Sequence, residues 1–186
     1  YNDTIYIGSN DGKLHAVAAD GSGELWNVTV NADGQVPSSP LLLDDQIVVT
    51  YKVGGMSVTD SGVVSYDYDG IKLWNASVGV VSSTPAITSS GIAVTSENGL
   101  KWKYIHPDAG FYNFAEADAF VALAEQRGLD VVGHALIWHD QVPGWVFRDD
   151  QGRPTSRELL IDRMREHIHT VVGRYRGRIK YWDVVN

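Results

Sequence analysis

The first half of the chain repeats itself, and this repeat limits the possible folds more than any other feature. Residues 40–50 align with residues 85–95 after a shift of 45, and the tripeptide Leu-Trp-Asn at 25–27 recurs at 73–75. The apolar stretches are short and are separated by Gly, Asp, Asn and Ser, which favour turns because they tolerate positive φ or bond their own backbone. A unit of about 45 residues made of about four short strands is typical of one β-propeller blade. The first half is therefore predicted to be all-β, with about two blades.

A local motif in this repeat carries a family resemblance. The sequence Asp-Gly-Ser-Gly-Glu-Leu-Trp at 20–26, echoed by Asp-Gly-Ile-Lys-Leu-Trp at 69–74, resembles the outer turn and tryptophan of PQQ-like (quinoprotein-type) β-propeller repeats. The resemblance covers residues 1–99, whereas a closed propeller needs at least four blades. Trp26 and Trp74 are interpreted as packing residues between blades, because no cluster of cations and carboxylates suited to a quinone stands beside them. No cofactor is expected.

The second half alternates strands and helices. Apolar residues recur at spacings of three and four between 114 and 124, which predicts a helix that opens with a capping box from Asn113 to Glu116 and ends at Gly128. A second capping box, from Thr155 to Glu158, predicts another helix. Such alternation predicts a parallel βαβαβ unit. The predicted strands are residues 91–95, 131–139 and 179–186.

Charge divides the chain at the same place. Residues 1–95 hold three basic and ten acidic side chains, whereas residues 96–186 hold twelve basic and thirteen acidic ones. We therefore predict two segments of different origin, 1–95 and 96–186. The first is too acidic to follow a phosphate backbone, so nucleic acid is not an expected partner. No apolar run reaches about 18 residues, so no membrane partner is expected, and no signal peptide is visible.

Polar and aromatic residues gather where the predicted parallel strands end, which is where sites lie in barrels and open sheets. Tryptophan offers an apolar face to a sugar ring, and Asn, His, Lys and Glu bond hydroxyls, so the sequence predicts part of a sugar site. Two histidine pairs, 134 with 139 and 167 with 169, diverge on a strand and on a helix, so no metal is expected. The residues at the strand ends are Glu97, Asn98 and Lys101 after the first strand, His134, Trp138 and His139 on and after the second, and Asp183 and Asn186 on the third.

Three ordered motifs in this half resemble one enzyme family. Residues 94–102, 133–139 and 182–186 look like the second, third and fourth barrel strands of glycoside hydrolase family 10, the endo-β-1,4-xylanases. The resemblance covers about residues 92–186 and implies part of a (β/α)8 TIM barrel. It implies that Asp183 supports a histidine that positions the nucleophile, and that histidine is expected to be missing. It further implies that β-1,4-xylan or xylo-oligosaccharides contact Glu97, Asn98, Lys101, His134, Trp138 and Asn186, with Asp183, His139 and Gln141 behind them.

The same resemblance predicts a chain without hydrolytic activity of its own. Retaining glycosidases need two carboxyls about 5–5.5 Å apart. In this family the acid/base Glu directly follows the Asn that corresponds to Asn186, the last residue here, and the nucleophile Glu lies on a later strand. Glu97 and Asp183 remain as a substitute pair, but the resemblance assigns one to sugar binding and the other to support. No catalytic residue is therefore expected, and the family implies a secreted, extracellular protein.

Two other functions and an unusual origin stay open. The chain could be a noncatalytic carbohydrate-binding module that uses Trp138, His134 and Glu97, or a structural β-repeat protein. Residues 91–99 fit both the third copy of the repeat and the second barrel strand, with no linker between the halves. We therefore expect a fragment or chimera joined at that stretch. Three barrel strands with two helices are also expected to leave the barrel-interior face and two strand edges uncovered.

Overall fold

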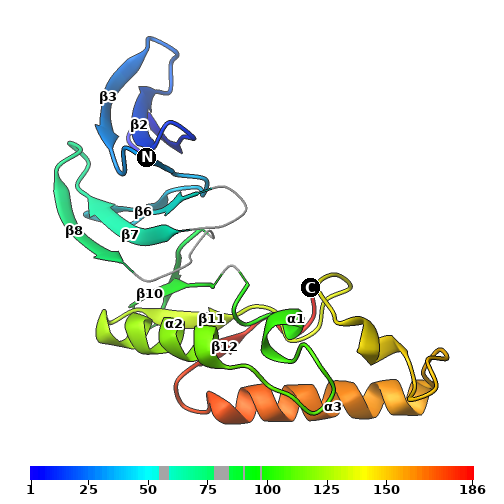
Figure 1. Ribbon diagram of the computed structural model, residues 1–186. Coiled ribbons are helices and arrows are strands. Elements are labelled where there is room, and N and C mark those ends of the chain that lie inside the picture. Colours follow the sequence, from blue (N-terminus) through cyan, green and yellow to red (C-terminus); the bar gives the residue numbers. More distant parts are fainter. Residues whose placement is uncertain (55–58, 78–83, 90, 97) are drawn as a thin grey trace.

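The computed structural model describes residues 1–54, 59–77, 84–89, 91–96 and 98–186. Two antiparallel sheets are stacked at the N-terminal end, and a third, mixed sheet lies with the helices at the other end (Figure 1). The C-terminus lies beside this helical layer (Figure 1). None of the described helices is long and apolar enough to cross a membrane.

The first two sheets are copies of one antiparallel arrangement, in which each strand pairs with the next along the chain. Both copies have an irregularity in the pairing at the same place, between Ala16 and Val17 in the first and between Ser65 and Tyr66 in the second. This confirms the repeat, while the assignment of each sheet to a propeller blade stays a prediction. The first sheet consists of β1 (Thr4–Gly8), β2 (Lys13–Ala18) and β3 (Glu24–Thr29), and the second of β6 (Ile47–Val53), β7 (Asp60–Tyr66) and β8 (Lys72–Ser77), with β4 (Gly34–Gln35) and β5 (Leu41–Leu42) paired to β6.

Trp26 joins the first sheet to the second. Its indole Nε1 donates a hydrogen bond of 3.1 Å to the backbone oxygen of Tyr68. A Cβ added at Gly70 would lie 3.1 Å from the indole ring, so the turn of the second copy covers that ring closely. Leu14 and Val49, one from each sheet, are buried in the same hydrophobic cluster. The interpretation of this tryptophan as a packing residue is therefore confirmed.

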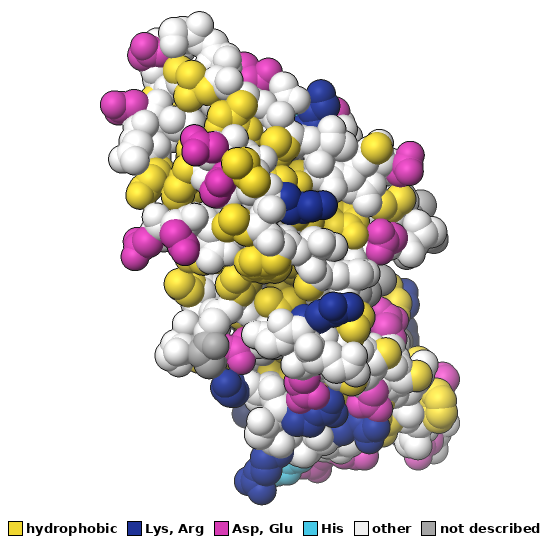
Figure 2. Space-filling model, turned by 90° about the vertical axis from the view of Figure 1, so that its left-hand side faces the viewer, with side chains coloured by type: hydrophobic (Ala, Val, Ile, Leu, Met, Phe, Trp, Pro, Cys, Tyr) yellow, Lys and Arg dark blue, Asp and Glu magenta, His cyan; other side chains and the backbone are white. Residues whose placement is uncertain are grey.

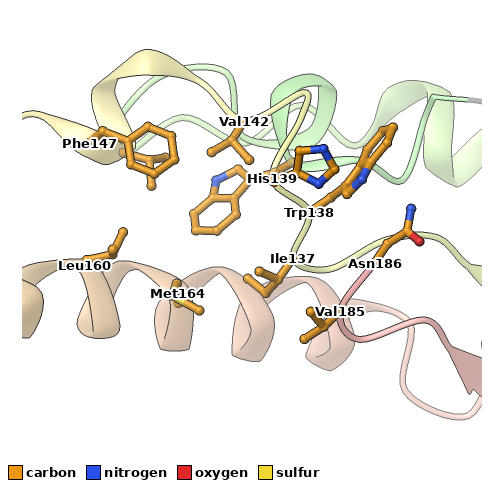
Figure 3. A pocket seen from close by; sticks show the side chains of 11 residues that line it. Ile137, Trp138, His139, Val142, Phe147, Leu160, Met164, Val185 and Asn186 are labelled. Atoms are coloured by element: carbon orange, nitrogen blue, oxygen red, sulfur yellow. The ribbon is translucent and has the colours of Figure 1, made fainter.

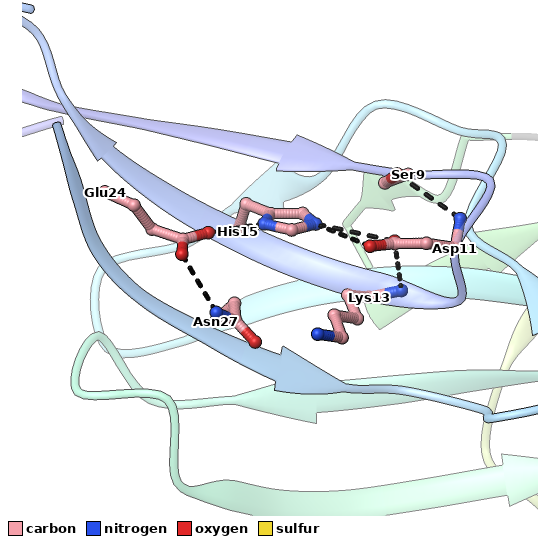
Figure 4. A network of polar contacts seen from close by, with 6 residues as sticks. All are labelled: Ser9, Asp11, Lys13, His15, Glu24 and Asn27. Atoms are coloured by element: carbon pink, nitrogen blue, oxygen red, sulfur yellow. Dashed lines mark hydrogen bonds and ion pairs between the residues drawn. The ribbon is translucent and has the colours of Figure 1, made fainter.

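One position on the outer face of the first sheet is polar where the second sheet has an apolar residue. His15 holds the position in its sheet that Val64 holds in the next, as their pairing with the preceding strands shows. Val64 is buried between the sheets, whereas His15 lies between Glu24, at 2.5 Å, and Asp11, at 3.4 Å (Figure 4). The hydrogen bond to Glu24 raises the pKa of His15 and lowers that of the carboxyl. The network places charged groups on the outer face of the first sheet, beside the exposed side chains of Ile5 and Ile7.

The third copy starts like the others and then changes its partner. β10 (Gly91–Val94) pairs antiparallel with β9 (Ala86–Thr88) and parallel with β11 (Asp130–Gly133), and β11 pairs parallel with β12 (Tyr181–Trp182). β10 therefore belongs to the repeat and to the predicted parallel unit. The expectation of two bare edges is wrong on one side, because β9 pairs with the edge of β10.

The parallel strands are shorter than the sequence predicts. β11 ends at Gly133 instead of residue 139, and β12 has two residues. Beyond them a single bridge between Ile137 and Val185 continues the parallel pairing. The residues after Gly133 and after Trp182 leave the regular sheet because they form loops at its C-terminal edge.

Two longer helices connect the parallel strands. α2 (Ala115–Gln126) ends before Gly128, whose φ of 68° suits glycine, and α3 (Arg157–Arg174) follows β11. Both predicted capping boxes are placed wrongly by one residue, because Phe114 caps α2 and Ser156 caps α3, accepting the Leu159 N–H. The shorter helices are α1 (Trp102–Ile105) and the 3-10 helix η1 (Gly144–Phe147).

One hydrophobic cluster crosses from the repeats into the helical layer. Val48 and Val63 of the second sheet belong to the same cluster as Val94 of β10, Leu129 before β11 and Val171 of α3. A boundary near residue 95 thus marks a change of architecture within a shared core. The different origin of segments 1–95 and 96–186 stays a prediction.

Two buried histidines lie among aromatic rings under α3. His167 is fully buried and stacks on Trp102 at 4.1 Å, and His106 is 1% exposed and stacks on Tyr112 at 3.8 Å. Within the described part of the chain, none of their ring nitrogens has a hydrogen-bond partner. Burial, with a smaller effect of His106, lowers the pKa of His167 to about 3. Burial also lowers the pKa of His106, and Glu166 offsets this in part.

Acid is expected to destabilise the protein through His167. The pKa of its unfolded form is about 6.5, so below that pH the unfolded chain takes up a proton that the folded form refuses until about pH 3. The free energy of unfolding should therefore fall by on the order of 3 kcal/mol between pH 7 and pH 4, measured by urea unfolding. His167→Phe should remove most of this fall, and the exposed His169→Phe should leave it intact. The same fall in all three proteins would contradict the assignment.

Two glycines that occupy the same turn of the two copies test the contact between the sheets. Gly21 and Gly70 have φ values of 80° and 83°, but a Cβ at Gly21 meets nothing within 4 Å, whereas one at Gly70 meets Trp26. Both alanine variants should lose about 1 kcal/mol from backbone strain. Gly70→Ala should lose a further 1–2 kcal/mol, roughly, by overpacking. Equal melting temperatures for the two variants would show that the turn does not hold Trp26.

Candidate functional site

The loops that follow β11 and β12 run side by side and form the floor of a polar edge. The Asp183 N–H donates to the Gly133 oxygen at 2.9 Å, and the Leu136 N–H donates to the Asp183 oxygen at 3.1 Å. The Asn186 N–H donates to the Ile137 oxygen at 3.0 Å. Backbone bonds thus hold the side chains after Gly133 next to those after Trp182.

His134 is held by a carboxylate from the neighbouring strand end. Its Nδ1 lies 2.8 Å from Oδ2 of Asp183, and both side chains are partly exposed. Asp183 thus has a histidine neighbour within this chain, while the absence of the histidine that positions the nucleophile stays a prediction. A carboxylate at Nδ1 fixes the ring orientation and, in the neutral ring, leaves Nε2 as an acceptor.

Lys101 connects the first strand end to the second. Its Nζ donates a hydrogen bond of 3.1 Å to Oδ1 of Asn98 and lies 5.1 Å from the centre of a Trp138 ring, in cation–π distance. The rings of Trp138 and His134 lie 6.1 Å apart. Asn98, Lys101, His134 and Trp138 therefore come together as the sequence predicts. Glu97, the remaining residue predicted here, lies outside the described residues.

His139 and Gln141 lie in the loop that follows this group. The His139 ring stands edge-on to Trp138, with centroids 5.7 Å apart and an interplanar angle of 82°. The Gln141 backbone oxygen accepts the Lys103 N–H at 3.0 Å, and its φ of 51° turns the chain sharply. The Gln141 bond attaches the loop to α1, and the supporting role of both residues stays a prediction.

A hollow of about 320 Å³ adjoins the polar group (Figure 3). Trp138, His139 and Asn186 line it on the side of the polar edge, and Leu160 and Met164 of α3 face them across the hollow (Figure 3). The sequence did not place α3 at the site. The available signal was the apolar stripe of this helix, to which Leu160 and Met164 belong.

The number of carboxylates and of potential metal ligands limits the reactions that the site could support. Among the predicted site residues that the structure describes, Asp183 is the one carboxylate, and it is engaged with His134. No group of three or more His, Cys, Asp or Glu among the described positions could hold a metal ion. In line with the predicted divergence, His167 lies on the buried face of α3, whereas His169 of the same helix is exposed.

Two family profiles match the chain. Glycosyl hydrolase family 10 matches residues 68–186, and the family described as Outer membrane protein assembly factor BamB matches residues 1–110. The chain belongs to both families. The matches overlap over residues 68–110, the stretch in which the second copy of the repeat leads through β10 into α1. The C-terminal part is accordingly a portion of the TIM barrel of family 10.

The relatives of the C-terminal part are xylanases by name. An endo-1,4-beta-xylanase A of Xylanibacter ruminicola is 50% identical over 101 residues, which are 54% of this chain and 27% of that protein. An endo-1,4-beta-xylanase B of Paenibacillus barcinonensis is 48% identical over 94 residues, covering 50% and 28%. An endo-1,4-beta-xylanase structure from Caldicellulosiruptor owensensis, 48% identical, has a TM-score of 0.49 over 50% of this chain and 29% of that one. The chain spans about a quarter of the length of the curated relatives.

Proposed function

We propose that the ends of β10, β11 and β12 form a binding site for β-1,4-xylan or xylo-oligosaccharides. The observation that carries the proposal is the convergence of Lys101, His134 and Trp138 from separate strand ends in a chain of family 10. The relatives named above act, by their names, on 1,4-β-xylan. The family implies an extracellular setting, which we include in the proposal.

The proposed contacts follow from the chemistry of each side chain. Trp138 would present its ring to a sugar face, since C–H groups of a pyranose pack on an aromatic surface. Lys101 and Asn98 would bond hydroxyls, with Lys101 already oriented by its contact with Asn98. His134 would accept a hydroxyl proton at Nε2, and Asn186 would address the 2-hydroxyl of the sugar at the reacting position. Glu97 is included by family resemblance alone.

We further propose that the 186 residues bind sugar without cleaving it. Retaining hydrolysis needs an acid/base and a nucleophile about 5–5.5 Å apart. Asp183 is the described carboxylate of the predicted site, and its contact with His134 assigns it to orienting that ring. Binding without cleavage is the function of a carbohydrate-binding module, so the two hypotheses agree on what this chain does alone.

Titration with xylohexaose followed by calorimetry tests the binding. Trp138→Ala should weaken affinity at least tenfold, about 1.4 kcal/mol, because the ring face is lost. Lys101→Met should weaken it about fivefold or more, whereas Lys103→Met, an exposed lysine two residues away, should bind like the wild type. A flat titration of the wild type would remove the proposal and leave a structural β-repeat role. Reducing-sugar release from soluble xylan above a boiled control would contradict the absence of cleavage.

A further inference from the structure

The two tryptophans of the repeat share their position but differ in what covers them. Trp26 is covered by the turn at Gly70 of the second copy. Trp74 is likewise fixed, because its Nε1 donates a hydrogen bond of 3.1 Å to Oε1 of Gln46. The third copy continues from β10 into the parallel unit, so the following repeat turn is replaced by the junction between α2 and β11. Trp74 therefore faces this junction, whereas Trp26 faces a repeat turn.

This junction leaves a hollow of about 400 Å³ beside Trp74, which we call the Trp74 hollow. Its volume lies within the range of small-ligand pockets, about 300–1,000 Å³. Two of its lining residues, Gly91 and Gly128, have no side chain to fill it, and a Cβ at Gly91 would meet only the Gly128 oxygen, at 3.8 Å. The hollow is lined by Trp74, Asn75, Ala76 and Gly91 from the strands, with Ile92 of β10, and by Arg127, Gly128 and Leu129 from the junction.

Arg127 gives the hollow hydrogen-bond donors. It is exposed, and it forms no ion pair with the described residues, whereas Arg174 and Arg178 pair with Asp118 and Glu125. On the face that carries β3, β8 and one end of α2, apolar side chains continue from the sheets toward the helical layer, with cationic side chains beside them (Figure 2). An aromatic ring fixed by a hydrogen bond and a guanidinium in the same lining together suit a neutral, hydroxyl-rich ligand.

We infer that the Trp74 hollow is a second binding site for a β-1,4-linked xylose chain. This inference rests on the proposed function for the identity of the sugar. Trp74 packs on the face of one xylose unit, and Arg127 donates to its hydroxyls. The hollow lies where β10 and β11 begin, and the first site lies where they end, so the two sites occupy opposite ends of the strands. A long polysaccharide is thereby held at a place separate from the first site.

The indole N–H resonances of the tryptophans test this inference by NMR during titration with xylohexaose. In wild-type protein, the signals of Trp74 and Trp138 should both shift and saturate. In the Trp138→Ala background, the Trp74 signal should still saturate. Adding Arg127→Ala should weaken that response at least fivefold, and adding Arg165→Ala, an exposed arginine of α3 whose partner is Asp162, should leave it unchanged.

The outcomes separate the two sites. A Trp138 response with an unmoved Trp74 signal would overturn the second site and leave the first intact. A Trp74 response with an unmoved Trp138 signal would overturn the first site and support the second. A Trp74 response that Arg127→Ala does not weaken would overturn the assignment of the Trp74 hollow. Arg127 is exposed at the end of a helix, so its replacement should not prevent folding.

Discussion

The structure depends on the pairing of β10 with partners of opposite direction. β9 pairs antiparallel on one side, as β5 pairs with β6 in the second copy, and β11 pairs parallel on the other. A parallel partner needs a crossover connection, which α2 provides, so the change of direction at β10 brings the helical layer into contact with the repeats. Val48 and Val63 then share a core with Val171, and the polar loops follow at the far ends of the same strands.

The proposed sugar site and the Trp74 hollow are both consequences of this junction. At the C-terminal ends of the parallel strands, backbone bonds between Asp183 and Leu136 place His134 beside its carboxylate. At the beginning of these strands, the third copy supplies no repeat turn for Trp74, and glycines floor the space instead. One end carries the side chains of the proposed site, and at the other end Trp74 is half-buried and has no repeat turn over it.

Much of this could be predicted from the sequence, because periodicity and local motifs report on neighbouring residues. The repeat, the two helices and the gathering of Lys101, His134 and Trp138 follow from such patterns, as does the family. The shorter strands, the pairing of His134 with Asp183 and the burial of His167 could not, since they depend on where loops leave the sheet and which groups face each other across it. The edge partner β9 was also missed, because a three-residue strand carries little periodicity.

The central claim is that the repeats and the helical layer share one core and unfold together. Native-state hydrogen exchange measures this directly, by comparing the opening free energies of amides in β7 and in α2. The account predicts one value for the most protected amides of both elements, because Val63 and Phe120 belong to the same cluster. If the amides of β7 kept their protection under conditions in which those of α2 exchanged freely, the two parts would be independent units and the account would be wrong.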